Sequence, residues 1–247
     1  IYADGYRYQL DEDSFSRQLC GTDRPGHFTG VLTVVMKLLN LVRPDRAYFG
    51  LKDFQQFTLI KDMCHTFFLP VEIVGCEIVR ERDGLAMSSR NRYLDPVQRE
   101  QAGALSAALL AGMYSAAQGA SAALDAARAV LDEVPALEVD YLELRDPALG
   151  PAPAEGPARL LVAARLGHTR LLDNIAVDPV AQGRGVGGRL ITAVEDWLRP
   201  RCDCYRLYTN VMMTANVDWY RSLGFRETGR HRVDGFDRIY FKKGLKS

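Results

Sequence analysis

Four residues suited to nucleotide chemistry follow one short apolar stretch of the chain. The sequence "FGLKDFQQ" places Gly50, Lys52, Asp53 and Gln56 where a predicted strand gives way to a predicted helix. Ligands of a doubly wound sheet bind at the carboxyl ends of its strands, where these residues fall. Lys52 can bind a phosphate, Asp53 can accept hydrogen bonds from ribose hydroxyls, and Gly50 permits close approach of the backbone. The stretch therefore predicts one loop of a nucleotide site.

A second loop carries consecutive hydrogen-bond donors. "DGLAMSSRN" follows the next predicted strand and contains Ser88, Ser89 and Arg90. An arginine side chain can bind a phosphate through two parallel hydrogen bonds. Together the two loops favour phosphate binding. The alternative is an ordinary capped helix followed by an ordinary polar loop.

A glycine-rich loop lies much later in the chain. "GRGVGG" fits the dinucleotide-binding spacing at Gly183, Gly185 and Gly188. That fingerprint also needs an acidic residue about 20 positions later, and "YRLYTN" at 205–210 offers none. Successive backbone N–H groups at the start of a helix bind a pyrophosphate without that acid. The loop therefore favours pyrophosphate binding over dinucleotide binding.

Alternating strand and helix patterns must position these loops. The apolar run 31–42 favours a helix, and the β-branched run 71–79 is typical of a buried parallel strand. A strand is predicted at 44–50 and a helix at 51–67. Together with the strand at 71–79 they form a βαβ unit, which indicates an α/β fold. The pattern predicts further helices at 95–117 and 121–133 and strands at 139–146, 171–177 and 205–210.

Local signals mark the ends of several elements. Asp95, Pro96 and Gln98 have the types and spacing of a capping box with proline at the first helical position. Residues 147–159 are rich in Pro and Gly and predict a loop, and 160–177 predict a hairpin that turns at Gly167. In the C-terminal part, a core face is predicted for a helix along Val186, Leu190, Val194 and Leu198.

Four segments resemble the pantoate–β-alanine ligase family, in the family's order and spacing. They are "RPGHFTGVLTVVMKLLNLVRPDRAYFGLKDFQQ", "PVEIVGCEIVRERDGLAMSSRNRYL", "VDYLELRD" and "LLVAARLGHTRLLDNI", within residues 2–176. The resemblance implies an ATP-dependent condensation of pantoate with β-alanine. Pantoate is first adenylated with release of pyrophosphate, and the amine of β-alanine then displaces AMP. Magnesium accompanies the ATP.

The resemblance also assigns residues. It places ATP binding on Gly50, Leu51, Lys52, Asp53, Val79, Met87, Ser88, Ser89 and Arg90, and pantoate binding on Gln56. Two departures stand out. Leu51 replaces the glutamate of the family's Phe-Gly-Glu-Lys-Asp loop, and the sequence contains no His-x-Gly-His motif, which the family carries in its N-terminal third. We therefore expect little ligase turnover from these 247 residues alone.

The C-terminal segment resembles the second half of the GNAT superfamily of acyl-CoA-dependent N-acetyltransferases. The carrying pattern is Gln-x-x-Gly-x-Gly followed by Asn-x-x-x-Tyr-x-x-x-Gly-Phe, over residues 171–247. The resemblance implies acetyl-CoA binding by Gln182, Gly183, Arg184, Gly185, Val186, Gly187 and Asn216. It makes Tyr220 the general acid that reprotonates the departing thiolate; packing in a helix core is the alternative for this tyrosine.

Composition narrows the function classes. Lys plus Arg and Asp plus Glu balance at 31 each, which gives no argument for binding nucleic acid or an anionic membrane. No apolar run approaches the roughly 18 residues of a spanning helix. The five cysteines lack metal-site spacing apart from Cys202 and Cys204, so free thiols and no protein-held metal are expected. The sequence starts with Ile1.

These observations combine into one expected architecture. The fold class is α/β: the C-terminal part of a nucleotidyltransferase-type Rossmann domain, a small α+β lid domain and a GNAT-like half-domain. The expected bounds are 1–92, 93–174 and 171–247, so that the strand "LLDNIAV" is shared and the hairpin 160–177 stands in for missing acetyltransferase strands.

Three functional hypotheses follow. The first is a pantoate–β-alanine ligase whose N-terminal part is absent. The second is a GNAT acetyltransferase with a ligase-like scaffold, and the third is a non-catalytic nucleotide- or CoA-binding chimera. A truncated record, a natural fusion and a constructed chimera all stay open, and so does the acetyl acceptor. The expected cofactors are ATP with magnesium and acetyl-CoA, in the cytoplasm, with a possible homodimer by family analogy.

Overall fold

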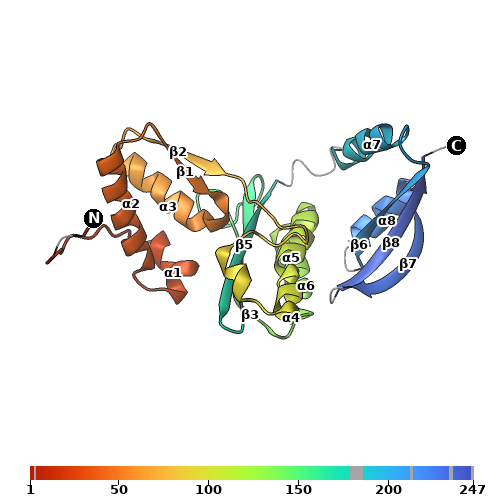
Figure 1. Ribbon diagram of the computed structural model, residues 1–247, viewed down its shortest axis with the longest axis horizontal. Helices are drawn as coiled ribbons and strands as arrows, with labels where there is room; N and C mark the ends of the chain where they lie inside the picture. The colour runs from red at the N-terminus through yellow and green to blue at the C-terminus, as the bar shows by residue number, and fades with distance from the viewer. Residues whose placement is uncertain (3, 179–185, 212–213, 234–235, 246–247) are drawn as a thin grey trace.

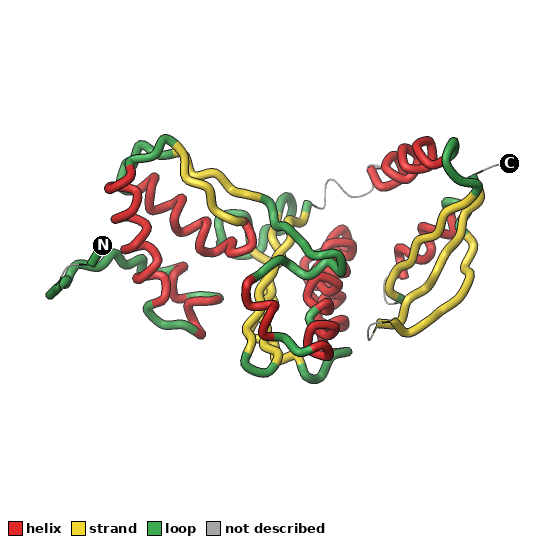
Figure 2. The backbone as a smooth tube through the Cα atoms, in the orientation of Figure 1, coloured by secondary structure: helices red, strands yellow, loops and turns green. Residues whose placement is uncertain are grey.

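The described part of the chain forms three separate β-sheets with helices packed on them (Figure 1). A computed structural model describes residues 1–2, 4–178, 186–211, 214–233 and 236–245. In the described residues, no helix is long and apolar enough to cross a membrane. Each sheet is formed by its own stretch of the chain, as the colours of Figure 1 show, and its strands are yellow in Figure 2.

The N-terminal part is a βαβ unit. Its main elements are α2 (His27–Val42), β1 (Arg46–Gly50), α3 (Phe54–Thr66) and β2 (Glu72–Cys76). Strands β1 and β2 pair in parallel from Arg46↔Glu72 to Gly50↔Cys76, which confirms the predicted unit. Short helices η1 (Phe15–Arg17), α1 (Cys20–Asp23) and η2 (Leu51–Asp53) complete this part.

Helical spacing explains why α2 and α3 lie where they do. Phe28, Leu32 and Leu39 recur on one face of α2 and are buried with Ile60 and Met63 of α3. The predicted helix 31–42 begins four residues earlier, because Gly26 in the left-handed region, at φ +76°, turns the chain into α2. The two helices therefore share one apolar core beside the parallel strands.

The central part is a three-stranded antiparallel sheet covered by two helices. Its elements are η3 (Ser89–Tyr93), α4 (Pro96–Gln101), α5 (Gly103–Ser115), η4 (Ala116–Gln118), α6 (Ala120–Asp132), β3 (Leu137–Arg145), β4 (Ala158–Leu166) and β5 (Thr169–Val177). The strand order is β3-β4-β5. The predicted hairpin and its turn are confirmed, with Gly167 at φ +55°. The capping box of Asp95 and Gln98 is also confirmed, but the predicted helix is divided into α4 and α5.

Close packing fixes the two long helices on this sheet. Leu105 and Leu109 of α5 are buried against β4, where Leu160 and Val162 are fully buried. A Cβ atom on Gly112 would lie 2.4 Å from Cδ2 of Leu160 and 2.9 Å from a backbone oxygen of α6. Glycine at this position therefore allows α5, α6 and β4 to approach one another.

The C-terminal lobe contains α7 (Val186–Leu198), β6 (Cys204–Asn210), α8 (Thr214–Ser222), β7 (Arg226–Val233) and β8 (Phe236–Gly244). Its strands are antiparallel in the order β6-β8-β7. Val217, Phe225, Ile239 and Phe241 form its buried core. The lobe therefore has an interior of its own.

Two sequence-based expectations about this lobe were wrong. In the described residues β5 pairs with β4 alone and β6 pairs with β8, so the hairpin 160–177 does not stand in for strands of the lobe. Val194 does not lie on a core face, because its side chain is 38% exposed, whereas Ile191 contacts the core. The predicted helix is present, but Val194 is not part of its buried face.

Candidate functional site

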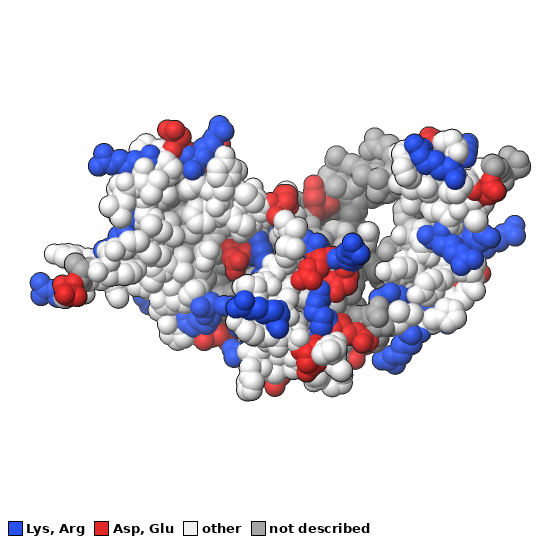
Figure 3. Space-filling view, viewed as in Figure 1, with Lys and Arg blue, Asp and Glu red and all other residues white. Residues whose placement is uncertain are grey.

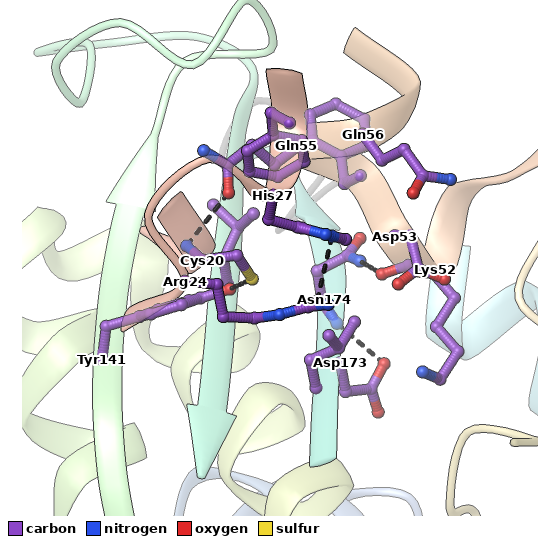
Figure 4. A pocket seen from close by; sticks show the side chains of 14 residues that line it. Cys20, Arg24, His27, Lys52, Asp53, Gln55, Gln56, Tyr141, Asp173 and Asn174 are labelled. Atoms are coloured by element: carbon purple, nitrogen blue, oxygen red, sulfur yellow. Dashed lines mark hydrogen bonds between the residues drawn. The ribbon is translucent and has the colours of Figure 1, made fainter. Parts of the chain in front are cut away.

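The loop between β1 and α3 lies beside a small cavity. Lys52, Asp53 and Gln56 line it, together with residues from α2 and β5 (Figure 4). The cavity encloses about 30 Å³. The carboxyl end of β1 therefore delivers the predicted residues to a cavity edge, as a parallel strand does in an α/β fold.

Asn174 of β5 holds this loop in place. Its Nδ2 donates to the backbone oxygens of Leu51 and Lys52, both at 2.9 Å. Its Oδ1 accepts from Arg159 Nη1 at 2.6 Å, and the residue is only 2% exposed. The amide is thus fully engaged and fixes the loop of Lys52 against the central sheet.

The neighbouring residue, Asp173, holds the second predicted loop. Arg80 donates to the two oxygens of Asp173 at 2.6 and 3.0 Å and to the backbone oxygen of Gly84 at 3.0 Å. Arg80 begins the segment that leads to Ser88. A two-point Arg–carboxylate pair fixes direction as well as distance. Two adjacent residues of β5 therefore hold both candidate nucleotide loops.

The loop of Ser88 is also supported from behind. Ser88 Oγ accepts from the Arg90 N–H at 3.2 Å and caps η3. Asn91 donates to Glu81 at 2.6 Å and to the Ala86 carbonyl at 3.1 Å. Arg90 itself is exposed. The loop is therefore ordered by its own hydrogen bonds while its arginine faces outward.

The predicted ATP residues are only partly brought together. Lys52 and Asp53 line the cavity, with the pantoate candidate Gln56, whereas Met87, Ser88, Ser89 and Arg90 lie outside its lining. Arg90 is near enough to lower the pKa of His27 in the cavity. Val79 is 63% exposed, and its carbonyl accepts from the Met87 N–H at 2.9 Å. A Cβ atom added to Gly50 would meet no atom within 4 Å, so the space beside this glycine is open to a ligand.

Leu51 packs where the family pattern has glutamate. Its side chain joins the apolar cluster of Leu19, Phe54 and Leu161 and lies against Gly75 of β2. The replacement therefore places an apolar side chain in apolar surroundings, and no polar group faces the cavity from this position.

Arg24 and His27 are cavity residues that sequence reasoning missed. Arg24 Nη1 donates to His27 Nε2 at 2.9 Å. Burial lowers the pKa of His27, the positive charges of Arg24 and Arg90 lower it further, and Asp53 opposes them. The imidazole is thus neutral at pH 7, with Nε2 as the acceptor. The signal was present, because both residues lie in the quoted segment "RPGHF".

Asp173 and Asn174 were also missed, although they interrupt the apolar strand "LLDNIAV". A carboxylate inside a buried strand needs a partner, and that need was the available signal. Cys20 was missed as well; its Sγ lies 3.2 Å from the Tyr141 hydroxyl and 3.4 Å from Arg170 Nη1. Burial, followed by the neighbouring Cys20, raises the pKa of Tyr141.

The candidate acetyltransferase residues border a second, larger cavity. Asn216 and Tyr220 line a space of about 710 Å³ whose other wall includes Tyr114 of α5 and Ile175 of β5. Figure 3 shows the surface hollowed between the central part and the C-terminal lobe. Burial, and then the nearby Tyr114, raise the pKa of Tyr220, which keeps its hydroxyl protonated at neutral pH.

Most of the predicted pyrophosphate loop cannot be compared. Gln182, Gly183, Arg184 and Gly185 lie outside the described residues. Val186 and Gly187 begin α7, close to the predicted helix start. The Tyr220 ring also contacts Phe225 and Phe241 at centroid distances of 5.6 and 5.7 Å. Its ring therefore packs in the core of the lobe while the residue borders the cavity.

Sequence comparison decides the lineage of the larger part. A sequence model described as pantoate-beta-alanine ligase matches residues 1–176. The chain belongs to the pantoate–β-alanine ligase family. Pantothenate synthetase of Mycolicibacterium smegmatis is 68% identical over 188 residues, which are 76% of this chain and 60% of the relative. Pantothenate synthetase of Nocardia farcinica is 58% identical over 177 residues, 72% of this chain and 56% of the relative. The chain thus spans about three fifths of these ligases.

Solved structures of the ligase family agree with the fold. Pantothenate synthetase of Thermus thermophilus matches with a TM-score of 0.67 and 44% identity, over 70% of this chain and 65% of that one. The Francisella tularensis pantoate-beta-alanine ligase matches with a TM-score of 0.54 and 30% identity, over 70% of this chain and 59% of that one, and was solved with "Beta-gamma ATP and Beta-alanine".

A second sequence model, described as a GNAT acetyltransferase domain, matches residues 155–227. The two matches overlap on residues 155–176, which include β4 and most of β5. The strand is therefore shared at the level of sequence, although it pairs only within the ligase sheet among the described strands.

Proposed function

We propose that the chain carries the adenylate-forming half-site of a pantoate–β-alanine ligase. The observation that carries the proposal is the cavity lined by Lys52, Asp53 and Gln56, with its loop fixed by Asn174. The buried amide holds the loop before any ligand arrives, and such preorganised charge is what phosphoryl chemistry needs.

The roles follow from the donors. Lys52 and Arg90 place positive charge on the triphosphate as the pantoate carboxylate attacks its α-phosphorus and pyrophosphate leaves. Gln56 orients the attacking carboxylate, and Asp53 binds the ribose hydroxyls. In the second step the amine of β-alanine attacks the acyl carbon, and AMP leaves with the bonding electrons. The backbone at Val79 and Met87 borders the adenine, with Ser88 and Ser89 donating to phosphate oxygens.

Several finer features complete the proposal. Magnesium would accompany ATP and would reduce the negative charge of its phosphates. The working compartment is the cytoplasm, and a homodimer is the proposed assembly. Because the sequence has no His-x-Gly-His motif, we expect AMP release dependent on pantoate and β-alanine to be far below the rate of an ordinary ligase. Loss of one such charge-stabilising donor typically costs ~3 kcal/mol of barrier.

Calorimetric titration of a non-hydrolysable β,γ-methylene ATP analogue tests the proposal. Lys52→Met should weaken the analogue at least tenfold, because it removes a charge from the phosphate site. Lys61→Met is the matched control, since Lys61 is an exposed lysine of α3 outside the cavity. Equal affinity of the Lys52→Met variant and the unaltered chain would contradict the proposal.

One observation favours a second candidate function, acyl-CoA binding by the C-terminal lobe. Tyr220 borders the 710 Å³ cavity with a raised pKa, as a proton donor to a departing thiolate requires. Gln182, Arg184 and the glycines of their loop would hold the pyrophosphate, with Asn216 beside the pantetheine arm. Acetyl-CoA should release heat with the unaltered chain and none with Gly185→Glu, whose carboxylate repels the pyrophosphate. Equal heats from both chains would refute this candidate.

A further inference from the structure

The cations around the ligase cavity divide into engaged and unengaged groups. Arg80 is paired with Asp173, and Arg170 is paired with Asp140 at 2.5 Å and Asp23 at 3.0 Å. Lys52 and Arg24 are cationic side chains that line the cavity. Among the described residues neither forms a salt bridge. Since Lys52 belongs to the proposed phosphate loop, Arg24 is a cation without an assigned anion.

Arg24 is held in position by a neutral partner. Its Nη1 donates to His27 Nε2, and His27 is the first residue of α2. A neutral imidazole takes one hydrogen bond from the guanidinium and leaves its charge uncompensated. The remaining N–H groups can bind a carboxylate through two parallel hydrogen bonds. Figure 4 shows Arg24 and Lys52 coming to the cavity from different elements, with the His27 ring above the end of the Arg24 side chain.

We propose that Arg24 binds the carboxylate of the amino-acid substrate, β-alanine, and that His27 is the positioning residue that aims it. The proposal rests on the ligase half-site proposed above. Pantoate's carboxylate is the group that becomes acylated and loses its charge, and Lys52 with Arg90 serve the phosphates. The carboxylate of β-alanine is then the anion that persists through the second step, and Arg24 is the cation left to meet it.

This assignment gives the cavity a means of selection. Two methylene groups separate the amine of β-alanine from its carboxylate, so a cation that binds the carboxylate discriminates β-alanine from simple amines. Propylamine has the same reacting end and no carboxylate. The unaltered chain should therefore bind β-alanine and reject propylamine.

Equilibrium binding of radiolabelled β-alanine tests the proposal, with and without the ATP analogue and pantoate. Arg24→Gln should weaken β-alanine at least tenfold and change the affinity of the ATP analogue less than twofold. Arg24→Lys should weaken β-alanine binding less, because lysine keeps the positive charge and loses only the two parallel hydrogen bonds of the guanidinium. Arg128→Gln, at an exposed site on α6, is the matched control. Thermal melting by circular dichroism establishes that each variant is folded.

Each outcome decides. An equal loss of ATP analogue and β-alanine in Arg24→Gln would make Arg24 a phosphate ligand and overturn the proposal. Unchanged β-alanine affinity in Arg24→Gln, or no β-alanine binding by the unaltered chain, would overturn it too. Failure of the ATP analogue alone would instead count against the ligase half-site, because β-alanine is also titrated in its absence.

A pH profile tests His27 separately. A protonated His27 is positively charged, and its Nε2 no longer accepts a hydrogen bond. It therefore repels the Arg24 guanidinium and no longer holds it in place. The affinity for β-alanine should therefore fall as the pH drops through the pKa of His27, which lies below 6.5 because burial and the charges of Arg24, Arg90 and Arg170 outweigh the opposing charge of Asp53. In His27→Gln the profile should be flat between pH 5 and 7.5. The same acid loss in both chains would refute the positioning role.

Discussion

The two candidate sites differ in the parts of the fold that form their walls. Around the ligase cavity, residues distant in sequence are joined by buried hydrogen bonds, from Asn174 to the loop of Lys52 and from Asp173 to Arg80. The larger cavity lies between β5 and the C-terminal lobe, whose strands pair in different sheets. Both sites carry a family motif, and at the ligase cavity buried hydrogen bonds also hold the motif-bearing loop against the central sheet. A preorganised site needs such supporting bonds as well as the motif.

The largest expected effect comes from breaking that bonding in the ligase part. Asp173→Ala leaves Arg80 without its carboxylate, and loss of one partner of a buried pair costs about 3 kcal/mol or more. Both tryptophans, Trp197 and Trp219, lie in the C-terminal lobe. Urea unfolding followed by circular dichroism should therefore shift, while unfolding followed by tryptophan fluorescence should not. Asp125→Ala, at an exposed site, is the control. A matching shift of both probes would show that the two regions unfold together.

A smaller effect is expected from packing within the central part. Gly112→Ala places a methyl group against Leu160 and the α6 backbone, and overpacking of this kind costs roughly 1–3 kcal/mol. Gly30→Ala, in α2 with open space around it, should stabilise the chain by up to about 1 kcal/mol. Urea midpoints measured by circular dichroism should move in opposite directions. A stabilising Gly112→Ala would mean that α5 and β4 are not in tight contact.

The smallest effect should be confined to the C-terminal lobe. Glu195 accepts from Tyr205 and Lys243, both at 2.7 Å, so Glu195→Gln should cost about 1 kcal/mol. Burial acts to raise the pKa of Glu195, but the bonds from Lys243 and Tyr205 outweigh it and lower the pKa below 4.5.

The Glu195 carboxylate makes the stability of the C-terminal lobe depend on pH. The stabilisation from a carboxylate with a lowered pKa is complete above pH 4.5 and is lost as the pH falls through its folded value. Tryptophan-detected stability should fall at acid pH in the unaltered chain and fall less in Glu195→Gln. An equal acid loss would assign the effect to other groups.

Local sequence signals predicted the elements well and their partners less well. The capping box at Asp95 and the turn at Gly167 depend on a few neighbouring residues, and both are confirmed. The bonds of Asp173 to Arg80 and of Asn174 to Leu51 span 93 and 123 residues. No local pattern specifies such pairs. Two adjacent polar residues in an apolar strand, Asp173 and Asn174, do indicate that they have partners elsewhere in the fold.

The shared strand shows the same limit. "LLDNIAV" has the pattern of a buried strand, and that pattern satisfied both family resemblances. Strand pairing depends on which edge is available in the folded chain, and β5 has its hydrogen-bonded neighbour in β4. The candidate site was predicted through Lys52, Asp53 and Gln56, which lie close together in one local motif and line one cavity. Arg24 was missed because the role of a single arginine depends on the groups that surround it in the folded chain, most of which are distant from it in the sequence.

The adjacent positions of Asp173 and Asn174 also determine how the molecule transmits force. β5 ends at Val177, and the polypeptide continues from there toward the C-terminal lobe. A pull on the lobe therefore loads β5 before any other strand. Since the two candidate nucleotide loops are anchored to neighbouring residues of that one strand, they would yield together under tension. The strand is therefore a common mechanical attachment point for both loops, and a force applied to the lobe would act on it directly.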